Sequence, residues 1–173
     1  FRADPNIFDS TACDLEMLIN RFREMAYLNK GLWISAAMES HPELDKTFYF
    51  EGGIASLVQH LNHGRDVLQE QPFYINQTVD TTVLEAAIQY NTGFYETVLA
   101  FANCINTSDG GTHLVGFRTA LTRAINTYAR KQKLLRDDQT NLSGEDVREG
   151  LTAVISVRLP EPQFEGQTKG KLG

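Results

Sequence analysis

The sequence predicts an α+β fold, a two-layer arrangement in which a mostly antiparallel sheet carries helices on one face. Three observations predict it. Apolar residues recur at spacings of three and four between residues 14 and 30, which indicates an amphipathic helix. Runs of β-branched and aromatic residues between residues 73 and 105 indicate neighbouring strands. A second long helical pattern, from residue 112 to about residue 136, has an apolar face that can pack on the sheet.

The first helix is expected to begin after Asp14, whose carboxylate can cap its first turn. It should end at Gly31, since glycine readily adopts the left-handed conformation of a helix stop. Residues 1–12 hold few periodic apolar positions and are interpreted as a connecting arm. Two short strands and a short helix are then expected, at residues 32–38, 47–51 and 54–61, with a turn at His41 and Pro42 between the strands.

Three central strands are expected at residues 73–79, 83–90 and 94–105, separated by the turn sequences Asp80–Thr81 and Asn91–Thr92–Gly93. A polar loop at 106–112 leads into the long helix, and Ser143 is the expected N-cap of another short helix. Residues 151–159 read as the last strand. Residues 163–173 show no periodic pattern and are expected to form an exposed loop or an exit towards a following domain.

Composition excludes several classes of protein. Hydrophobic residues make up 42% of the 173 residues and charged residues 22%, which is typical of a globular domain. The net charge of −6 disfavours non-specific coating of nucleic acid or of an anionic membrane. No apolar run approaches the roughly 20 residues of a membrane span. Cys13 and Cys104 lack the CxxC spacing, which indicates reduced thiols, and Cys104 is expected in a core strand.

The long helix separates its apolar residues from its cations. Leucine, phenylalanine and other apolar side chains share one arc, and no acidic residue occurs between His113 and Arg136. The cations on the other arc are Arg118, Arg123, Arg130, Lys133 and Arg136. Such a stripe can hold a phosphate backbone, or it can be a solvated face that pairs with nearby acids. The sequence by itself favours the second interpretation.

Other candidate sites carry weaker signals. The loop Asp109–Gly110–Gly111 before the long helix could hold an anion, but a plain turn with a cap explains it better. The four histidines share no metal-ligand spacing, so no metal site is expected. The segment from Gln167 to Lys171 is interpreted as a flexible cationic loop, whose lysine could reach a neighbouring phosphate site or simply be solvated.

Four segments together carry a family resemblance. They are YFEGGI at 49–54, NTSDGGTHLVGFR at 106–118, GEDVREGL at 144–151 and QTK at 167–169. The type IIA topoisomerases have these segments in the same order and at the same spacing. The chain resembles their transducer domain, as found in the ATPase subunit of bacterial DNA gyrase (gyrase B) and in its topoisomerase IV sister, over essentially its whole length.

The resemblance implies the transducer fold of the GHKL ATPases, a ribosomal-protein-like fold with a left-handed β-α-β crossover. It also implies an ATPase domain upstream of this chain. Residues 1–12 would then be the connecting arm from that domain, residues 13–162 the transducer domain, and residues 163–173 the Gln-Thr-Lys loop and exit segment. The whole enzyme would be an ATP-hydrolysing isomerase that passes one DNA duplex through another. This fragment alone, which lacks the GHKL motifs, is expected to be inactive.

The resemblance also assigns residues and partners. Lys169 would contact the γ-phosphate of ATP in cis, with Gln167 supporting it, while Arg118 would face the DNA duplex in transit. Mg²⁺ would belong to the whole enzyme and not to this fragment. The implied partners are a second copy of the same polypeptide in an ATP-dependent dimer, the DNA-cleaving partner subunit and double-stranded DNA, in the cytoplasm and without a membrane.

Two other hypotheses remain open at this point. The chain could be a stand-alone nucleic-acid-binding module that uses the basic helix without ATP, or the transducer of a MutL-like ATPase. The Asp-Gly-Gly-Thr-His segment at 109–113 argues against the second of these. Gyrase and topoisomerase IV share the resemblance equally, because the two differ in a DNA-wrapping partner subunit.

Overall fold

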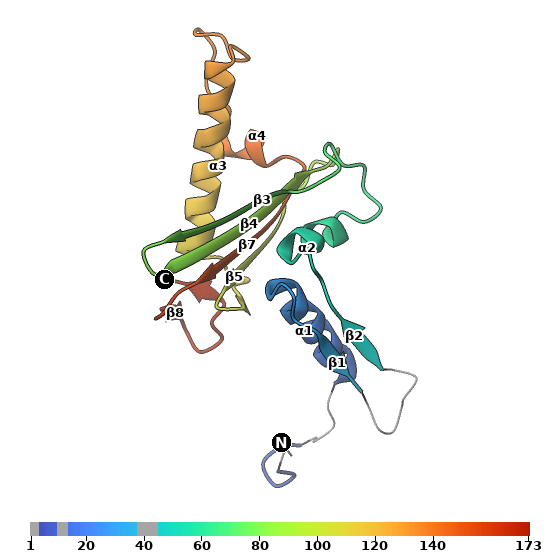
Figure 1. The fold of residues 1–173 in the computed structure, drawn as a ribbon. Helices are drawn as coiled ribbons and strands as arrows, with labels where there is room; N and C mark the ends of the chain where they lie inside the picture. The colour runs from blue at the N-terminus through green and yellow to red at the C-terminus, as the bar shows by residue number, and fades with distance from the viewer. Residues whose placement is uncertain (1–3, 10–13, 38–44) are drawn as a thin grey trace. The chain divides into compact units, whose positions relative to one another are not determined.

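The computed structural model describes residues 4–9, 14–37 and 45–173 (Figure 1). The chain divides into two compact units, Phe1–Gly53 and Ile54–Gly173. The predicted His41–Pro42 turn and Cys13 lie outside the described residues. The sequence led us to expect one boundary after residue 12, whereas the two units meet at Gly53.

The first unit contains helix α1 (Leu15–Leu28) and the antiparallel strands β1 (Ile34–Ala36) and β2 (Lys46–Phe48). The predicted cap is confirmed, because Asp14 Oδ1 accepts a hydrogen bond from the backbone N–H of Met17 at 3.0 Å. The last turn of α1 is buried, and the ring of Tyr27 stacks on that of Phe50 with 3.6 Å between centroids. Aromatic stacking therefore joins the end of α1 to the segment that follows β2.

The second unit is built on a five-stranded sheet in the order β3-β4-β7-β5-β6 (Figure 1). The strands are β3 (Phe73–Val79), β4 (Thr82–Tyr90), β5 (Thr97–Ala102), β6 (Ile105–Asn106) and β7 (Leu151–Arg158). All neighbours are antiparallel except β5 and β7, which are parallel. The predicted α+β class and the strands at 73–79, 83–90 and 151–159 are thus confirmed, with boundaries within a residue or so.

The expected strand at 94–105 is wrong, because it is interrupted by a tight turn. Asn103 and Cys104 both have positive φ angles, 48° and 62°, which reverses the chain between β5 and β6. The Asn103 side chain fixes the turn, donating to the Leu159 carbonyl at 2.8 Å and accepting from the Leu159 N–H at 2.7 Å. Cys104 is consequently a half-buried turn residue and not part of a core strand.

Helices cover both faces of this sheet rather than one. Leu151, Ala153 and Ile155 of β7 pack with apolar residues of α3 (Thr112–Lys131), whereas Thr152 points the other way and bonds Asn62 after α2 (Ile54–Leu61). Helix α2 lies against β4 and β7 on that second face. Strand β7 is covered on both sides, which explains why its sequence is continuously apolar. The parallel pair β5 and β7 is joined through α3, forming a β-α-β crossover.

Two helix ends test the sequence-based capping rules. The cap of α4 (Gly144–Arg148) is confirmed: Ser143 Oγ accepts from the Asp146 N–H at 3.1 Å, and Asp146 Oδ2 accepts from the Ser143 N–H at 2.7 Å. These hydrogen bonds hold the pKa of Asp146 below its ordinary value. The predicted end of the long helix at Arg136 is wrong. The helix stops at Lys131, and Lys133 has a positive φ of 56°.

A buried polar network ties α2 to the sheet. Asn62 Oδ1 accepts from Thr152 Oγ1 at 2.7 Å and from Asn91 Nδ2 at 3.2 Å. Its own Nδ2 donates to Gln89 Oε1 at 2.8 Å. All four side chains are buried. Each therefore depends on the others for its hydrogen bonds, since water does not reach them.

Asn62→Ala is expected to lower the free energy of unfolding of this chain by about 3 kcal/mol, because it leaves buried groups of Thr152, Asn91 and Gln89 without their partner. Denaturant titration of the two proteins measures the difference. Gln59→Ala is the control, since the exposed Gln59 on the same helix bonds only the exposed Gln71. Equal unfolding midpoints for both variants would contradict the prediction.

Candidate functional site

The last residues of the chain form a small hairpin. Strand β8 (Phe164–Glu165) pairs antiparallel with β9 (Lys171–Leu172), and Leu172 is buried. The expectation of a loop throughout 163–173 is therefore wrong at its base, although the tip with Gln167, Thr168 and Lys169 is exposed. Sequence periodicity could not reveal this hairpin, because strands of two residues are too short to show alternation.

Lys169 presents a positive charge at the tip of this hairpin. Its backbone is left-handed, with a φ of 57°, and its Nζ lies 5.7 Å from the centroid of the Phe164 ring. Among the described residues, no carboxylate lies within ion-pair distance of this ammonium group. A lysine placed in this way is a compact, exposed cation that an anionic group can approach.

The base of the hairpin is anchored to the loop that starts α3. The backbones of Gly111 and Leu172 form a parallel β-bridge. Three hydrogen bonds accompany it: Asp109 N–H to the Gly170 carbonyl at 2.8 Å, Leu172 N–H to the Gly110 carbonyl at 3.1 Å, and Thr112 Oγ1 to the Gly173 carbonyl at 2.9 Å. Segments about 60 residues apart in the sequence are thus held as one structure.

Glycine is required for this close approach. A Cβ atom on Gly111, whose φ is +141°, would lie 2.4 Å from the Leu172 carbonyl oxygen and 2.7 Å from its nitrogen. A Cβ on Gly170 would lie 2.4 Å from a carboxylate oxygen of Asp109. The glycines of the Asp109–Gly111 loop therefore serve the docking of β9. This agrees with a structural turn and not with an anion site.

His113, in the first turn of α3, is a structural histidine. Its Nε2 lies 3.0 Å from Thr107 Oγ1, which in turn donates to the Ala100 carbonyl at 2.9 Å. Burial lowers the pKa of His113 below its ordinary value, so the ring is neutral at pH 7. Within the described ranges, no three His, Cys, Asp or Glu side chains are grouped so that they could hold a metal ion.

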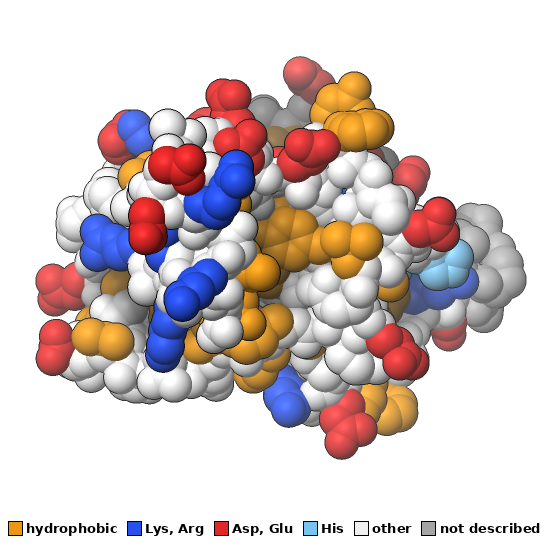
Figure 2. Space-filling view, turned by 90° about the horizontal axis from the view of Figure 1, so that it is seen from above, with side chains coloured by type: hydrophobic (Ala, Val, Ile, Leu, Met, Phe, Trp, Pro, Cys, Tyr) orange, Lys and Arg blue, Asp and Glu red, His pale blue; other side chains and the backbone are white. Residues whose placement is uncertain are grey.

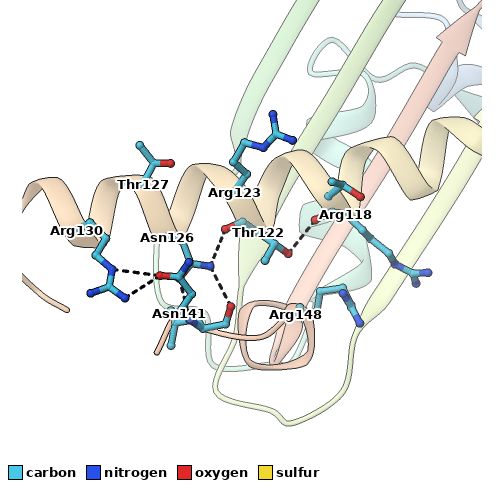
Figure 3. A pocket seen from close by; sticks show the side chains of 11 residues that line it. Arg118, Thr122, Arg123, Asn126, Thr127, Arg130, Asn141 and Arg148 are labelled. Carbon is cyan, nitrogen blue, oxygen red and sulfur yellow. Dashed lines mark hydrogen bonds between the residues drawn. The ribbon is translucent and has the colours of Figure 1, made fainter. Parts of the chain in front are cut away.

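A polar groove of about 660 Å³ runs between α3 and the segment from Asn141 to Arg148 (Figure 3). Four arginines line it, namely Arg118, Arg123, Arg130 and Arg148. The heads of Arg118 and Arg148 point in the same direction, whereas Arg123 points to another side of α3 (Figure 3). Looking down on the far end of α3, Lys and Arg side chains gather in this part of the surface (Figure 2).

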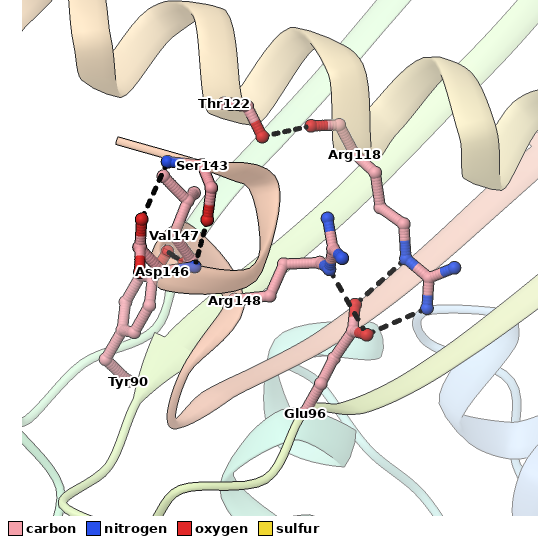
Figure 4. Close-up of polar contacts among 8 residues, drawn as sticks. All are labelled: Tyr90, Glu96, Arg118, Thr122, Ser143, Asp146, Val147 and Arg148. Carbon is pink, nitrogen blue, oxygen red and sulfur yellow. Dashed lines mark hydrogen bonds and ion pairs between the residues drawn. The ribbon is translucent and has the colours of Figure 1, made fainter. Parts of the chain in front are cut away.

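Arg118 is paired with an acid. Its Nε and Nη2 donate to the two carboxylate oxygens of Glu96, at 3.0 and 2.9 Å (Figure 4). Arg148 Nε lies 3.4 Å from the same carboxylate. The interpretation of the cationic face as one that pairs with acids is thus confirmed for Arg118. Sequence reasoning missed Glu96, because it lies 22 residues before Arg118, in the loop that leads into β5.

The rest of the predicted stripe is shorter than expected. The Arg130 guanidinium bonds Asn141 Oδ1 and the carbonyls of Arg136 and Gln139, so it holds the segment that follows α3. Lys133 and Arg136 lie beyond the end of the helix, because α3 stops at Lys131. Arg118 and Arg123 remain as the helical cations of the predicted stripe that line the groove without closing this segment.

Comparison with known proteins agrees with these features. The model of the family DNA gyrase B matches residues 53–173. The DNA gyrase B protein of Streptococcus pneumoniae is 54% identical over 175 residues, covering 100% of this chain and 27% of that protein. The chain thus spans about a quarter of the length of this relative.

Two solved structures share the fold. The 43K ATPase domain of Thermus thermophilus gyrase B, in complex with an aminocoumarin, matches with a TM-score of 0.86 and 41% identity over 98% of this chain and 45% of that one. The topoisomerase IV ATP-binding domain of Francisella tularensis matches with a TM-score of 0.79 and 29% identity, over 98% of this chain and 45% of that one. None of the helices in the described ranges combines the length and apolar composition needed to cross a bilayer. The chain belongs to the DNA gyrase B family.

Proposed function

We propose that this chain is the transducer region of the ATPase subunit of a bacterial type IIA DNA topoisomerase, where it couples ATP binding and hydrolysis to DNA strand passage and supercoiling. One observation carries the proposal. The hairpin that bears Lys169 is bonded to the loop from which α3, the helix of Arg118, begins. A displacement of the hairpin tip would therefore act on the helix that faces DNA.

The transducer itself corresponds to the unit Ile54–Gly173, and the preceding unit belongs with the upstream ATPase domain. The division at Gly53 and the family match over residues 53–173 both support this boundary. The greater similarity to a gyrase protein, 54% identity against 29% for the topoisomerase IV structure, supports a gyrase.

Lys169 fits a role beside ATP. Its ammonium is exposed, and no acid among the described residues neutralises it. Bound ATP with Mg²⁺ supplies the γ-phosphoryl group and its negative charge. Lys169 provides a point charge for that phosphate and Gln167 supports the tip, while the nucleotide pocket itself lies upstream. This fragment alone should consequently hydrolyse no ATP.

The partners follow from the same function. A second copy of the same polypeptide, a DNA-cleaving partner subunit and double-stranded DNA would complete the enzyme, in the bacterial cytoplasm. A stand-alone nucleic-acid-binding module is the alternative from a different class. It would bind short duplex DNA strongly as an isolated fragment, with a steep dependence on salt.

Arg118→Gln in the full-length subunit is expected to lower the ratio of DNA-stimulated to basal ATP turnover about tenfold. The variant removes one charge-assisted phosphate contact, and the loss of such a contact is of this size. Turnover with and without linear duplex DNA measures the ratio.

Arg158→Gln serves as the matched control, because Arg158 pairs with Glu85 at the end of β7 and does not line the groove. It should keep the ratio of the parent. An equal loss of basal and stimulated turnover in Arg118→Gln would instead indicate a folding defect and would contradict a role in DNA contact.

A further inference from the structure

Three charged side chains from three elements meet at one end of the polar groove (Figure 4). Glu96 comes from the loop before β5, Arg118 from α3 and Arg148 from the last residue of α4. Their side chains are 23%, 37% and 25% exposed. One carboxylate therefore holds two guanidinium groups at a partly solvated edge, and the three groups carry a net charge of +1.

The geometry leaves part of Arg118 available. Glu96 occupies the edge formed by Nε and Nη2, at 3.0 and 2.9 Å. A guanidinium has five N–H donors, so the N–H groups of Nη1 and one of Nη2 stay outside this bidentate pair. Figure 4 shows the remaining end of the guanidinium directed away from Glu96. The carboxylate thus fixes the plane of Arg118 and turns its other edge outwards.

Arg148 is held from two sides. Its Nε lies 3.4 Å from Glu96 Oε2, and a Cβ on Gly144 would lie 2.7 Å from its Nη1. The first residue of α4 must therefore be small for the guanidinium to lie where it does. This placement sets Arg148 beside Arg118 on the same side of the groove, as Figure 3 shows.

We propose that Arg148 is a second contact for the DNA phosphate backbone and that Glu96 is the positioning residue that holds Arg118 and Arg148 side by side for it. The proposal rests on the proposed function, in which Arg118 faces DNA. Two planar guanidinium groups with fixed orientation suit phosphate oxygens, which accept paired hydrogen bonds. Glu96 does not touch DNA. It acts by reducing the number of orientations that the two arginines lose on binding.

The test measures ATP turnover of the full-length subunit, assembled with its partner subunit, against the concentration of linear duplex DNA. Glu96→Gln removes the charge that orients both arginines. It is expected to raise the DNA concentration for half-maximal stimulation about tenfold, with the plateau recovered at excess DNA. Arg148→Gln should raise it similarly and should lower the salt dependence of DNA binding by about 0.9 in the logarithmic slope, which corresponds to one phosphate contact.

The matched control is Glu85→Gln, because Glu85 also pairs with an arginine, Arg158, but outside the groove. Its DNA dependence should be that of the parent. A variant with both Arg118→Gln and Arg148→Gln provides a further check. In this background Glu96→Gln should have no additional effect, since Glu96 acts only through the two arginines.

The outcomes separate the two proposals. A half-maximal DNA concentration in Glu96→Gln that equals or falls below that of the parent, while Arg118→Gln impairs stimulation, overturns the positioning role alone. An additional loss from Glu96→Gln in the background without both arginines overturns it as well. Unchanged stimulation in Arg118→Gln overturns the DNA contact of the proposed function and this inference with it.

Discussion

Lys169→Ala in the full-length subunit is expected to slow ATP hydrolysis about a hundredfold while ATP binding stays close to that of the parent. Lys169 lies at an exposed hairpin tip and not inside a nucleotide pocket. A cation that arrives from outside stabilises charge that develops in the reaction more than it stabilises the bound ground state. Loss of one such group typically costs a factor of this size in turnover. Steady-state turnover and equilibrium binding of a non-hydrolysable nucleotide measure the two effects separately.

Lys171→Ala is the matched control. Lys171 lies two residues further along the same hairpin, but its Nζ pairs with Glu165 at 3.1 Å and it belongs to β9. Removing this exposed pair should change stability by less than about 1 kcal/mol and leave turnover unchanged. Equal turnover of Lys169→Ala and the parent would rule out the contact with the γ-phosphate. Equal losses in both lysine variants would indicate that the hairpin needs positive charge in general.

Elements with long, strong patterns could be predicted from the sequence. The helix at 54–61 and the strand at 73–79 have the predicted boundaries, because their periodicities and flanking turn residues agree. The expected strand at 94–105 failed, since Asn103 and Cys104 take left-handed conformations that nothing in an apolar run indicates. The long helix was predicted five residues too long. Its C-terminal residues continue the polar and apolar pattern, and the stop is made by tertiary contacts of Arg130.

The site was predictable residue by residue, but not as an arrangement. Arg118 and Lys169 carried enough signal to be singled out. What the sequence could not reveal is that Glu96 holds Arg118, or that Leu172 lies against Gly111, 61 residues earlier. Both are contacts between segments far apart in the chain, and they depend on how α3 crosses the sheet. The two candidate residues therefore appeared independent until the fold connected their elements.

Gly111→Ala tests that connection and is expected to undock the hairpin. The new Cβ would lie 2.4 and 2.7 Å from backbone atoms of Leu172, which cannot rotate away as a side chain could, and the φ of +141° is strained for any other residue. We expect a loss of about 2–3 kcal/mol in the free energy of unfolding, because strained backbone and overpacking both contribute. In the full-length subunit, ATP turnover should fall towards that of Lys169→Ala, since an undocked hairpin no longer positions the lysine.

Gly116→Ala is the control that isolates docking from glycine replacement. Gly116 lies on the same helix with open space around the position of its Cβ, so alanine there should stabilise the helix by about 0.5–1 kcal/mol. If Gly111→Ala lowers stability but keeps parental turnover, Lys169 reaches its phosphate without the anchor, and the link from hairpin to α3 has no part in coupling. If turnover falls while DNA stimulation of the residual activity is also lost, the anchored loop is the route by which the nucleotide site and the arginines of α3 act on each other. That second result is the one expected, because the hydrogen bonds at this loop join the two elements directly.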